Sequence, residues 1–542
     1  MKTLAPLFAL TLFACDAAPL PDAGQADASL DADSLPDAAL ADAAPSDASP
    51  DGSPPDGGTP VGLTEEVMTD LGPVRGTEDG ATVRFLGIPY AAPPTGDRRF
   101  RPPADPSPWT EPLEARSFGP SCPQRLEDTL TGDEDCLQLN VWAPAAPGPH
   151  PVMVWIHGGA FIQGSATLDL YDGTPFAESG VVLVSVNYRV GALGFLADST
   201  LTDEAGTAGN YGLLDQVAAL SWVQRNGAAF GGDPSQVTVF GESAGGSSAC
   251  ALMAMPAADT LFQRAIVQSG GGCYGWPSLA DASAVGADIV EAVGCARSEA
   301  AAVRACLREA SVADLVNAQF TTGSSALGLP PIGPTVDGTH LPETTLARVT
   351  RGDGPARPVI TGSNADEART FVSAVPVPTI GVYESLVRSR LGDQADAALA
   401  IYPASDFDTP KLAYEAIVGD LSFVCPALSF VRALSDRATP VFTYHYTHLL
   451  NGLAARAGAI HGAEIIPLFG AWDQVARYTP VEADFRVGRE MRAEWTSFAR
   501  EGSPRETWSA YPSIRILDDP FATTLSIREG RCDALRSAGL VP

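Results

Sequence analysis

The residue best suited to covalent chemistry in this 542-residue chain is a serine in a glycine-flanked turn. Ser243 is the centre of the sequence Gly-Glu-Ser-Ala-Gly at 241–245, between a β-branched run at 237–240 and an Ala-rich helical stretch. A G-x-S-x-G string in that context predicts a nucleophile elbow, a strained turn that exposes the serine hydroxyl above a sheet. The small flanking residues let the backbone turn without collision, and the helix that follows favours the negative charge of acyl transfer. The alternative is a tight turn with an idle serine.

A second motif could stabilise that negative charge. The sequence His-Gly-Gly-Ala-Phe at 157–161 directly follows an apolar run at 152–156. A glycine-rich loop in this position can point backbone N–H groups at an oxyanion, and the N–H of Ala244, the residue after the serine, would supply another donor. The alternative is an ordinary turn between a strand and a helix, but the two motifs reinforce each other.

A serine nucleophile also needs a base and an acid that orients the base. In enzymes with a serine on such an elbow, the chain order is serine, acid, histidine. Four of the six histidines follow the serine: His340, His445, His448 and His461. The two in and beside the aromatic strand predicted at 441–446 are typical packing residues, and His340 lies in a turn flanked by Gly and Pro. His461 lies in a loop before a glycine, where an imidazole could face the site, and is the predicted base.

The elements that position these residues are short apolar runs bounded by Gly and Pro. They lie at 152–156, 181–186, 237–240, 265–267, 359–361 and 441–446. Helical patterns lie between several of them, as at 213–223 and 244–253. This alternation predicts a largely parallel sheet covered by helices on both faces, with a ligand site beyond the carboxyl ends of the strands. Asp366 and Glu367 follow one of these runs and are both candidates for the acid.

The composition indicates an acidic chain with a large apolar core. Hydrophobic residues make up 45%, charged residues 18%, and the net charge is −31. Phosphate binding needs clustered Lys and Arg, so nucleic acid is disfavoured as a partner. From residue 61 to 542 the composition is that of one globular domain without repeats, and we expect no membrane-spanning segment of ~20 apolar residues in it.

The N-terminal sixty residues read as an export signal followed by a linker. A positive start at Met1-Lys2 precedes an apolar run at 4–13 that is too short to cross a bilayer. Residues 1–15 end in Leu-Phe-Ala-Cys, which resembles a bacterial lipoprotein box and predicts a lipid on Cys15; ordinary cleavage, or retention as an anchor, are the alternatives. Residues 16–60 hold ten Asp and no Lys or Arg among Ala, Pro, Ser and Gly, which is typical of a disordered linker. We therefore expect an exported protein, lipid-anchored at the cell envelope or secreted.

The cysteines fit an oxidising compartment. If Cys15 carries lipid, eight of the nine remain: Cys122, Cys136, Cys250, Cys273, Cys295, Cys306, Cys425 and Cys532. An even set suits disulfides, but eight cysteines allow too many pairings for the residues alone to decide. The alternative is that some stay as buried thiols. They are too scattered to predict a zinc site, and we expect no metal and no organic cofactor.

Together these motifs resemble those of the type B carboxylesterase and cholinesterase family, from about Gly72 to near the C-terminus. Residues 230–245 are similar to the serine signature of that family, and the sequence Glu-Asp-Cys-Leu-Gln-Leu-Asn-Val at 134–141 is similar to its second signature. Further family-like strings lie at 87–91, 187–189 and 209–216. The resemblance implies an α/β-hydrolase fold over 61–542, with a central, mostly parallel sheet and helices on both faces.

The resemblance also implies roles for single residues. The family uses a glutamate in a segment like 362–367, which selects Glu367 over Asp366, and a histidine in a segment like 461–465, which supports His461. The implied oxyanion donors are the backbone N–H groups of Gly159, Ala160 and Ala244. The implied disulfides are Cys122–Cys136, Cys295–Cys306 and Cys425–Cys532, which leaves Cys250–Cys273 as the fourth by default.

The chain departs from the family in three places. Ala368 follows Glu367 where relatives usually have Gly, which puts the local turn in question. Ala160 replaces a third Gly but keeps its N–H donor. Cholinesterases bind a quaternary ammonium partly on a Trp in the first disulfide loop, and no aromatic residue lies between Cys122 and Cys136. Without a ring there a cation–π site is missing, so choline esters are disfavoured.

The expected function is hydrolysis of small carboxylic esters through an acyl-enzyme on Ser243, with His461 as base and Glu367 orienting it. The same apparatus could serve an amidase, a lactonase or an acyltransferase, but an ester is favoured because its leaving group needs less help. An inert binding or adhesion module on the same fold is the other alternative. It is disfavoured because the serine, glutamate, histidine and glycine loop are all present.

Overall fold

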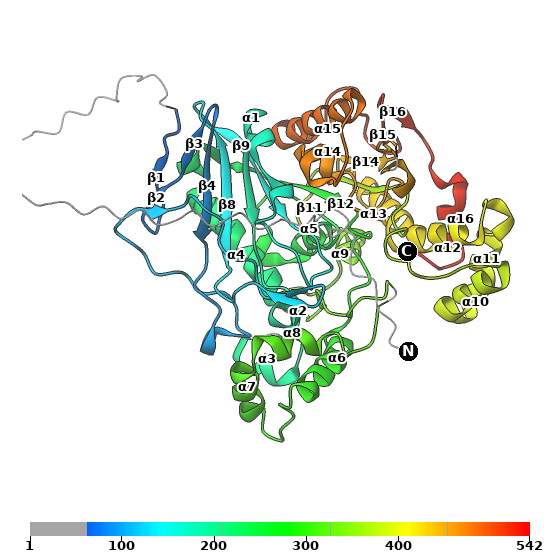
Figure 1. The fold of residues 1–542 in the computed structure, drawn as a ribbon, viewed down its shortest axis with the longest axis horizontal. Coiled ribbons are helices and arrows are strands. Elements are labelled where there is room, and N and C mark those ends of the chain that lie inside the picture. The colour runs from blue at the N-terminus through cyan, green and yellow to red at the C-terminus, as the bar shows by residue number, and fades with distance from the viewer. Residues whose placement is uncertain (1–61, 206–207, 326, 453) are drawn as a thin grey trace, which may run out of the picture.

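The largest element of the structure is a mixed sheet of eleven strands (Figure 1). The computed structural model describes residues 62–542 apart from 206–207, 326 and 453, so the predicted signal, Cys15 and the linker 16–60 lie outside the described residues. The strand order is β16-β15-β14-β13-β12-β11-β9-β10-β8-β4-β3. In chain order the bounds are β3 Thr77–Asp79, β4 Thr82–Pro89, β8 Gln138–Pro144, β9 His150–Ile156, β10 Val182–Val186, β11 Gly232–Glu242, β12 Arg264–Gln268, β13 Val359–Asn364, β14 Val441–Tyr446, β15 Ile514–Leu517 and β16 Ala522–Thr524.

The six predicted strands form the parallel centre of this sheet. They are β9 to β14, and every neighbouring pair among them is parallel, as is the pair of β14 and β15. Within this sheet, the antiparallel pairs of described strands lie only toward the two edges. They are β8 with β10, β8 with β4, β3 with β4, and β16 with β15. Smaller sheets join β1 (Glu66–Met68), β2 (Pro73–Arg75) and β5 (Leu113–Glu114), and β6 (Gln124–Leu126) and β7 (Thr129–Thr131).

The central strands are apolar on both sides because each side faces a separate core. In β9, Val152, Val154 and Ile156 belong to one hydrophobic cluster, whereas Met153 and Trp155 belong to the other. Successive side chains of a strand point to opposite faces, so a strand covered on both faces is apolar at every position. This is why the runs seen in the sequence were continuous rather than alternating.

Helices cover both faces of the sheet (Figure 1). Helices α4, α5 and α13 pack in the first cluster, and α1, α14 and α15 in the second. Helices α6 to α8 also contribute buried residues to the first cluster, whereas α10 to α12 pack in a third. The π-helix η8 (Asp420–Val424) lies between α12 and α13. The bounds are α1 Thr174–Glu178, α2 Gly191–Phe195, α3 Ser199–Ala205, α4 Tyr211–Asn226, α5 Ala244–Ala254, α6 Leu279–Ala292, α7 Ala300–Glu309, α8 Val312–Ala318, α9 Thr345–Arg351, α10 Ile380–Leu391, α11 Ala395–Ile401, α12 Pro410–Gly419, α13 Cys425–Ser435, α14 Ile465–Phe469, α15 Glu482–Glu501 and α16 Arg531–Ser537.

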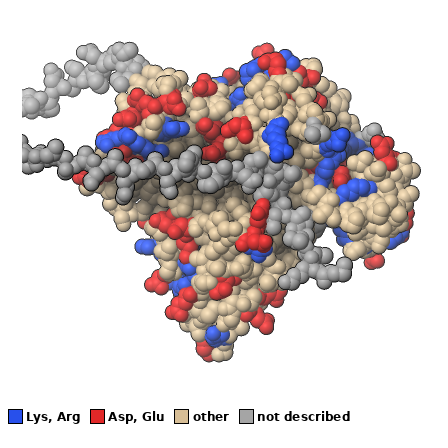
Figure 2. All heavy atoms as spheres, in the orientation of Figure 1, with Lys and Arg blue, Asp and Glu red and all other residues tan. Residues whose placement is uncertain are grey.

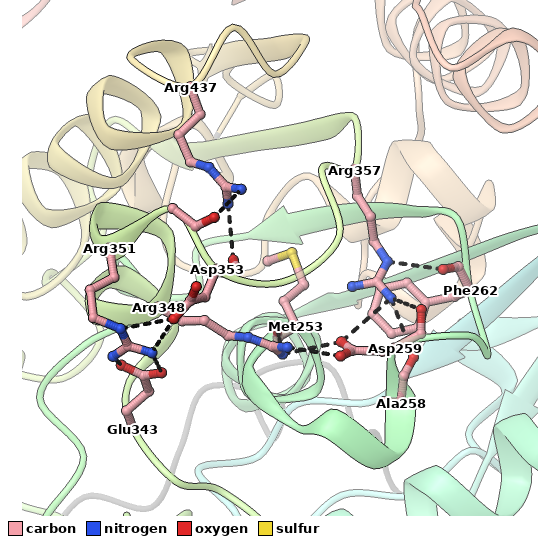
Figure 3. Close-up of polar contacts among 11 residues, drawn as sticks. Met253, Ala258, Asp259, Phe262, Glu343, Arg348, Arg351, Asp353, Arg357 and Arg437 are labelled. Atoms are coloured by element: carbon pink, nitrogen blue, oxygen red, sulfur yellow. Dashed lines mark hydrogen bonds and ion pairs between the residues drawn. The ribbon is translucent and has the colours of Figure 1, made fainter.

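Arginines hold the far end of α5 (Figure 3). Arg348 of α9 donates to the carbonyl of Met253 in the last turn of α5, and pairs with Asp259 at 2.8 Å. Arg357 is buried over the ring of Phe262 and donates to the carbonyl of that residue at 2.9 Å. Because the last carbonyls of a helix have no partners within the helix, the bond from Arg348 fixes the last turn of α5, and Arg357 holds the segment that follows it.

Other charged groups are dispersed over the surface. On the face drawn in Figure 2, Asp and Glu lie interspersed with Lys and Arg over the described part of the chain. Some are paired, as Arg75 is with Glu66 and Glu114, each at 2.8 Å. Exposed pairs of this kind contribute about 1 kcal/mol or less to stability.

Two sequence predictions about covalent and membrane features can be compared with the structure. Four disulfides join the pairs expected: Cys122–Cys136, Cys250–Cys273, Cys295–Cys306 and Cys425–Cys532. The expectation that no later segment is long and apolar enough to span a membrane was wrong by length and composition, because the helical run Pro410–Ser435 contains an 18-residue window with a mean hydropathy of 1.6. That window is 78% buried inside the protein, as expected for a core helix.

Candidate active site

Ser243 lies in a strained turn between β11 and α5. Its φ and ψ are 55° and −121°, a region that residues with a side chain rarely occupy. Only glycine fits at the neighbouring positions for steric reasons. A Cβ atom on Gly245 would lie 1.9 Å from the carbonyl oxygen of Ile156, and a Cβ atom on Gly241 would lie 2.5 Å from the same oxygen. Ser243 is half-buried, whereas the residues on either side of it are buried. The segment has the geometry predicted for an elbow.

Glu367 and His461 meet beyond the ends of β13 and β14. The Nδ1 atom of His461 is 2.5 Å from Oε2 of Glu367. The other carboxylate oxygen accepts hydrogen bonds from Ser269 Oγ and from the backbone N–H of Asn364, each at 2.7 Å. A buried carboxylate is costly unless its oxygens have partners, and these contacts fix both oxygens of Glu367 and the orientation of the imidazole.

Asp366, the other candidate acid, has different partners. Its carboxylate lies 2.8 Å from Arg369 and accepts a hydrogen bond from the backbone N–H of Ala459 at 2.9 Å. Asp366 therefore holds together the two loops that carry Glu367 and His461. Ala368 does not have a left-handed φ, so the turn after the acid has no need of the glycine that relatives usually have there.

The second ring nitrogen of His461 faces another carboxylate. Nε2 lies 3.2 Å from Oε1 of Glu242, and within the described residues it has no hydrogen-bond partner, Ser243 included. A hydrogen bond between nucleophile and base often tightens only in the complex with substrate. Glu464 is a third buried carboxylate close by, and it accepts a hydrogen bond from Asn364 at 2.5 Å.

These carboxylates set the electrostatics of the imidazole. Burial by itself lowers the pKa of His461, but the negative charges of Glu242, Glu367 and Glu464 outweigh it and raise that pKa to about 9. Burial raises the pKa of Glu242 and of Glu464 above the usual range of a carboxyl group. The site therefore stabilises a protonated imidazole, which is the species that a base forms when it takes a proton from a serine.

Two phenylalanine rings cover His461. Phe371 and Phe423 are stacked on each other with their centroids 5.6 Å apart, and those centroids lie 5.0 and 4.7 Å from that of the imidazole. Phe423 belongs to the π-helix η8, a rare element that often occurs at functional sites. The rings restrict rotation of the imidazole and keep its surroundings apolar.

The glycine loop after β9 has a tightly turned backbone. Gly159 has a φ of 112°, and Ala160 and Phe161 have left-handed φ values of 57° and 62°. The carbonyl of Gly159 accepts hydrogen bonds from the N–H groups of Ile162 and Gln163, each at 3.1 Å. In contrast, the N–H groups of Gly159, Ala160 and Ala244, the three predicted donors, have no backbone partner among the described residues.

Several residues at this site were missed by the sequence analysis. Glu242 is the variable second residue of the G-x-S-x-G string, and Glu464 lies three positions after His461, but neither position carries a signal in a single sequence. Ser269 is separated from Glu367 by 98 residues, so only the fold reveals their contact. Within the described ranges, no group of three His, Cys, Asp or Glu side chains could hold a metal ion.

Comparison with known proteins covers almost all of these elements. The model of the carboxylesterase family matches residues 64–534. This chain belongs to the carboxylesterase family. The predicted family is therefore confirmed. As a carboxylesterase, the protein is a carboxylic ester hydrolase of the serine hydrolase class, and its substrates are small-molecule esters.

Individual relatives agree with this family assignment. The fumonisin B1 esterase of Sphingopyxis macrogoltabida is 38% identical over 462 residues, which are 82% of this chain and 83% of the relative. The acetylcholinesterase of Bungarus fasciatus is 33% identical over 521 residues, 86% and 85% of the two chains. The solved structure of a PNB esterase is 33% identical, covers 87% of this chain and 99% of its own, and has a TM-score of 0.78. These structural neighbours confirm the α/β-hydrolase fold predicted for this carboxylesterase.

Proposed function

We propose that this carboxylesterase acts through a triad of Ser243, His461 and Glu367 and an acyl-enzyme intermediate. His461 takes the proton of Ser243 Oγ while that oxygen bonds to the ester carbonyl carbon. Glu367 holds the imidazole in the tautomer whose Nε2 can accept this proton. The negative charge of Glu367 stabilises the imidazolium that forms.

The remaining steps use the same groups. Negative charge on the former carbonyl oxygen is bound by the N–H groups of Gly159, Ala160 and Ala244. When the carbonyl re-forms, the bond to the alcohol oxygen breaks and His461 gives its proton to that oxygen. Water then attacks the acyl-serine, again losing a proton to His461, and the carboxylic acid leaves as Ser243 regains its proton.

One arrangement carries the proposal. Ser243 is half-buried in a strained turn and is followed directly by the start of α5. His461, the only described histidine that is hydrogen-bonded to Glu367, lies beside Glu242, the residue before this serine. An idle serine would not require a backbone conformation that costs about 1–3 kcal/mol. Three buried carboxylates around one histidine would likewise be costly without a use for the charge.

The test is hydrolysis of a short-chain p-nitrophenyl ester by the full chain and by Ser243→Ala. We expect Ser243→Ala to lose at least about 10³-fold in kcat. Ser221→Ala, in which the lost hydroxyl bonds only to the carbonyl of Val217 within α4, is the matched control and should keep its kcat. Full activity in Ser243→Ala would exclude this serine as the nucleophile, and an inactive parent would favour an inert binding module.

We also propose that the protein is exported and carries a lipid on Cys15. The lipoprotein-like string at 12–15 and four disulfides, which are typical of oxidising compartments, support this location. Mass spectrometry of the N-terminal peptide from the native host should find a diacylglyceryl group on Cys15. A free N-terminus at another residue would show ordinary cleavage instead.

A further inference from the structure

Gln124 is a buried side chain that hydrogen-bonds to both backbone polar groups of a single residue, Gly164. It lies in β6, inside the loop closed by the disulfide Cys122–Cys136, and is 2% exposed. Its Nε2 donates to the carbonyl of Gly164 at 2.9 Å, and its Oε1 accepts from the N–H of Gly164 at 2.7 Å. The same Nε2 also donates to the carbonyl of Cys122 at 3.0 Å. One amide thus ties the disulfide loop to Gly164.

Gly164 closes the loop that holds the proposed oxyanion donors. Its φ is 109°, and a Cβ atom there would lie 2.2 Å from the carbonyl oxygen of Gly158 and 2.5 Å from Nδ1 of His157. The end of the loop is therefore packed directly against its beginning. A Cβ atom on Gly159 would in turn lie 2.2 Å from the carbonyl oxygen of Gln163. A displacement of Gly164 would be transmitted to the peptides of Gly158 and Gly159 because no space separates them.

Few other groups hold this loop. Tyr188 donates its hydroxyl to the carbonyl of His157 at 3.0 Å, before the donors, and the N–H of Gly191 donates to the carbonyl of Phe161 at 2.6 Å. In the part of the chain that the structure describes, Gln124 is the only side chain with hydrogen bonds to the backbone of residues 159–164. Without it, the N–H and the carbonyl of the half-buried Gly164 lose these partners.

We propose that Gln124 is a positioning residue that sets the oxyanion loop, so that the disulfide loop at 122–136 contributes to catalysis without touching the reacting atoms. The inference rests on the proposed function, because it assigns the N–H groups of Gly159 and Ala160 to the oxyanion. Such donors act only when they lie about 2.7–3.1 Å from the position that the oxyanion occupies. A loop with a loose end holds them at that distance for less of the time.

The test compares Gln124→Met with Gln224→Met in the full chain. Methionine keeps the volume of glutamine but removes its hydrogen bonds. Gln224 is a matched control because its Nε2 also donates to two backbone carbonyls, those of Pro234 and Leu261, each at 2.9 Å, but within a region of α4 away from the loop. Gln124→Glu is a second variant, which keeps the acceptor for the N–H of Gly164.

The readouts are kcat and KM for a p-nitrophenyl ester, normalised by active-site titration, and the inhibition constant of a trifluoromethyl ketone. This ketone forms a hemiketal with a serine nucleophile and places an oxyanion in the hole. For Gln124→Met we expect kcat to fall about 10- to 100-fold, KM to change less than about 3-fold, and the inhibition constant to rise with the fall in kcat. Gln124→Glu should give an intermediate kcat, and Gln224→Met should leave all three quantities unchanged.

Two outcomes would overturn the proposal. In the first, Gln124→Met keeps its kcat per titrated site. In the second, its kcat falls while the inhibition constant of the ketone stays at the parent value, which would show a loss unrelated to the oxyanion. Failure of the proposed function is distinguishable, because it would appear as activity retained by Ser243→Ala.

Discussion

At the scale of single residues, Glu242, the carboxylate before the proposed nucleophile, is foremost among the charges that oppose the effect of burial on the pKa of His461. Glu242 lies 3.2 Å from the ring nitrogen that would accept the proton of Ser243, and its charge is the first of those that raise the pKa of His461. A histidine acts as a base only when it is neutral. If His461 is the base, as proposed, its raised pKa of about 9 means that the active, neutral form predominates only at alkaline pH in the free enzyme.

Replacing this carboxylate should shift the pH profile in a definite direction. In Glu242→Gln the imidazolium loses a stabilising negative charge, so the pKa of His461 falls and the neutral base appears at lower pH. We expect the rise of kcat/KM with pH to move to lower pH by about one unit, measured with the p-nitrophenyl ester. The exposed Glu482 supplies the control variant Glu482→Gln, and an unchanged or higher midpoint in Glu242→Gln would contradict the argument.

The residues that the sequence could and could not predict differ in how local their signals are. Ser243 and the glycine loop at 157–161 stand in short strings whose context names their chemistry. The choice of Glu367 over Asp366 required the family resemblance, because both follow the same strand. Gln124 carries no local signal at all, since its partner Gly164 is 40 residues away.

At the scale of elements, predictability depends on burial of both faces of a strand. The six parallel strands were visible as continuous apolar runs, whereas the antiparallel strands β4 and β8 were not. β8 is almost wholly buried but contains Asn140, whose side chain accepts from the N–H of Gly87 and donates to Ser185 Oγ. A polar residue that is satisfied by distant partners interrupts the apolar pattern without interrupting the strand.

The disulfide Cys250–Cys273 connects two elements that meet at the site. Cys250 is buried in α5, the helix that begins after Ser243, and Cys273 is buried in the loop after β12 that also carries Ser269. The N-terminal part of α9 adds a backbone hydrogen bond, from Leu346 to the carbonyl of Cys273 at 3.1 Å. The disulfide thus joins the helix after the proposed nucleophile to the loop that supports the proposed acid, Glu367.

Removing this disulfide should lower both stability and rate. For the double variant Cys250→Ala, Cys273→Ala we expect a loss of about 2–4 kcal/mol in the free energy of unfolding, measured by urea denaturation, and a lower kcat. The pair Cys295 and Cys306 closes a shorter loop away from these residues, so its double Ala variant should lose stability but keep kcat. Equal kcat in the two double variants would show that the bond does not act on the site.

At the scale of the whole molecule, a histidine buried in the sheet links stability to pH. Burial, together with the positive charge of Arg528, lowers the pKa of His445 in β14 to about 3. An unfolded histidine takes up a proton near pH 6.5. Between these two pH values the unfolded chain binds a proton that the folded chain does not, so the stability that His445 contributes is present above about pH 6.5 and is lost as the pH falls toward 3.

The size of this effect can be measured. Between pH 7.5 and pH 5 the parent should lose about 2 kcal/mol more of its unfolding free energy than His445→Leu, which cannot take up a proton. Urea denaturation at the two pH values gives both differences. Parallel losses in parent and variant would show that other groups determine the acid sensitivity.

The distance along the chain between the partners of the site has a consequence for folding. His461 lies 94 residues after Glu367, and both lie far beyond Ser243 in the sequence. These three residues can therefore come together only after strands from most of the sequence have formed the sheet. Contacts between distant segments form slowly because the intervening chain must first be ordered. During synthesis the segment with Ser243 leaves the ribosome long before His461, so under the proposed mechanism the nascent chain still lacks its base. Recovery of activity after dilution from denaturant should therefore lag behind recovery of helical circular dichroism, which makes turnover a reporter of completed sheet assembly.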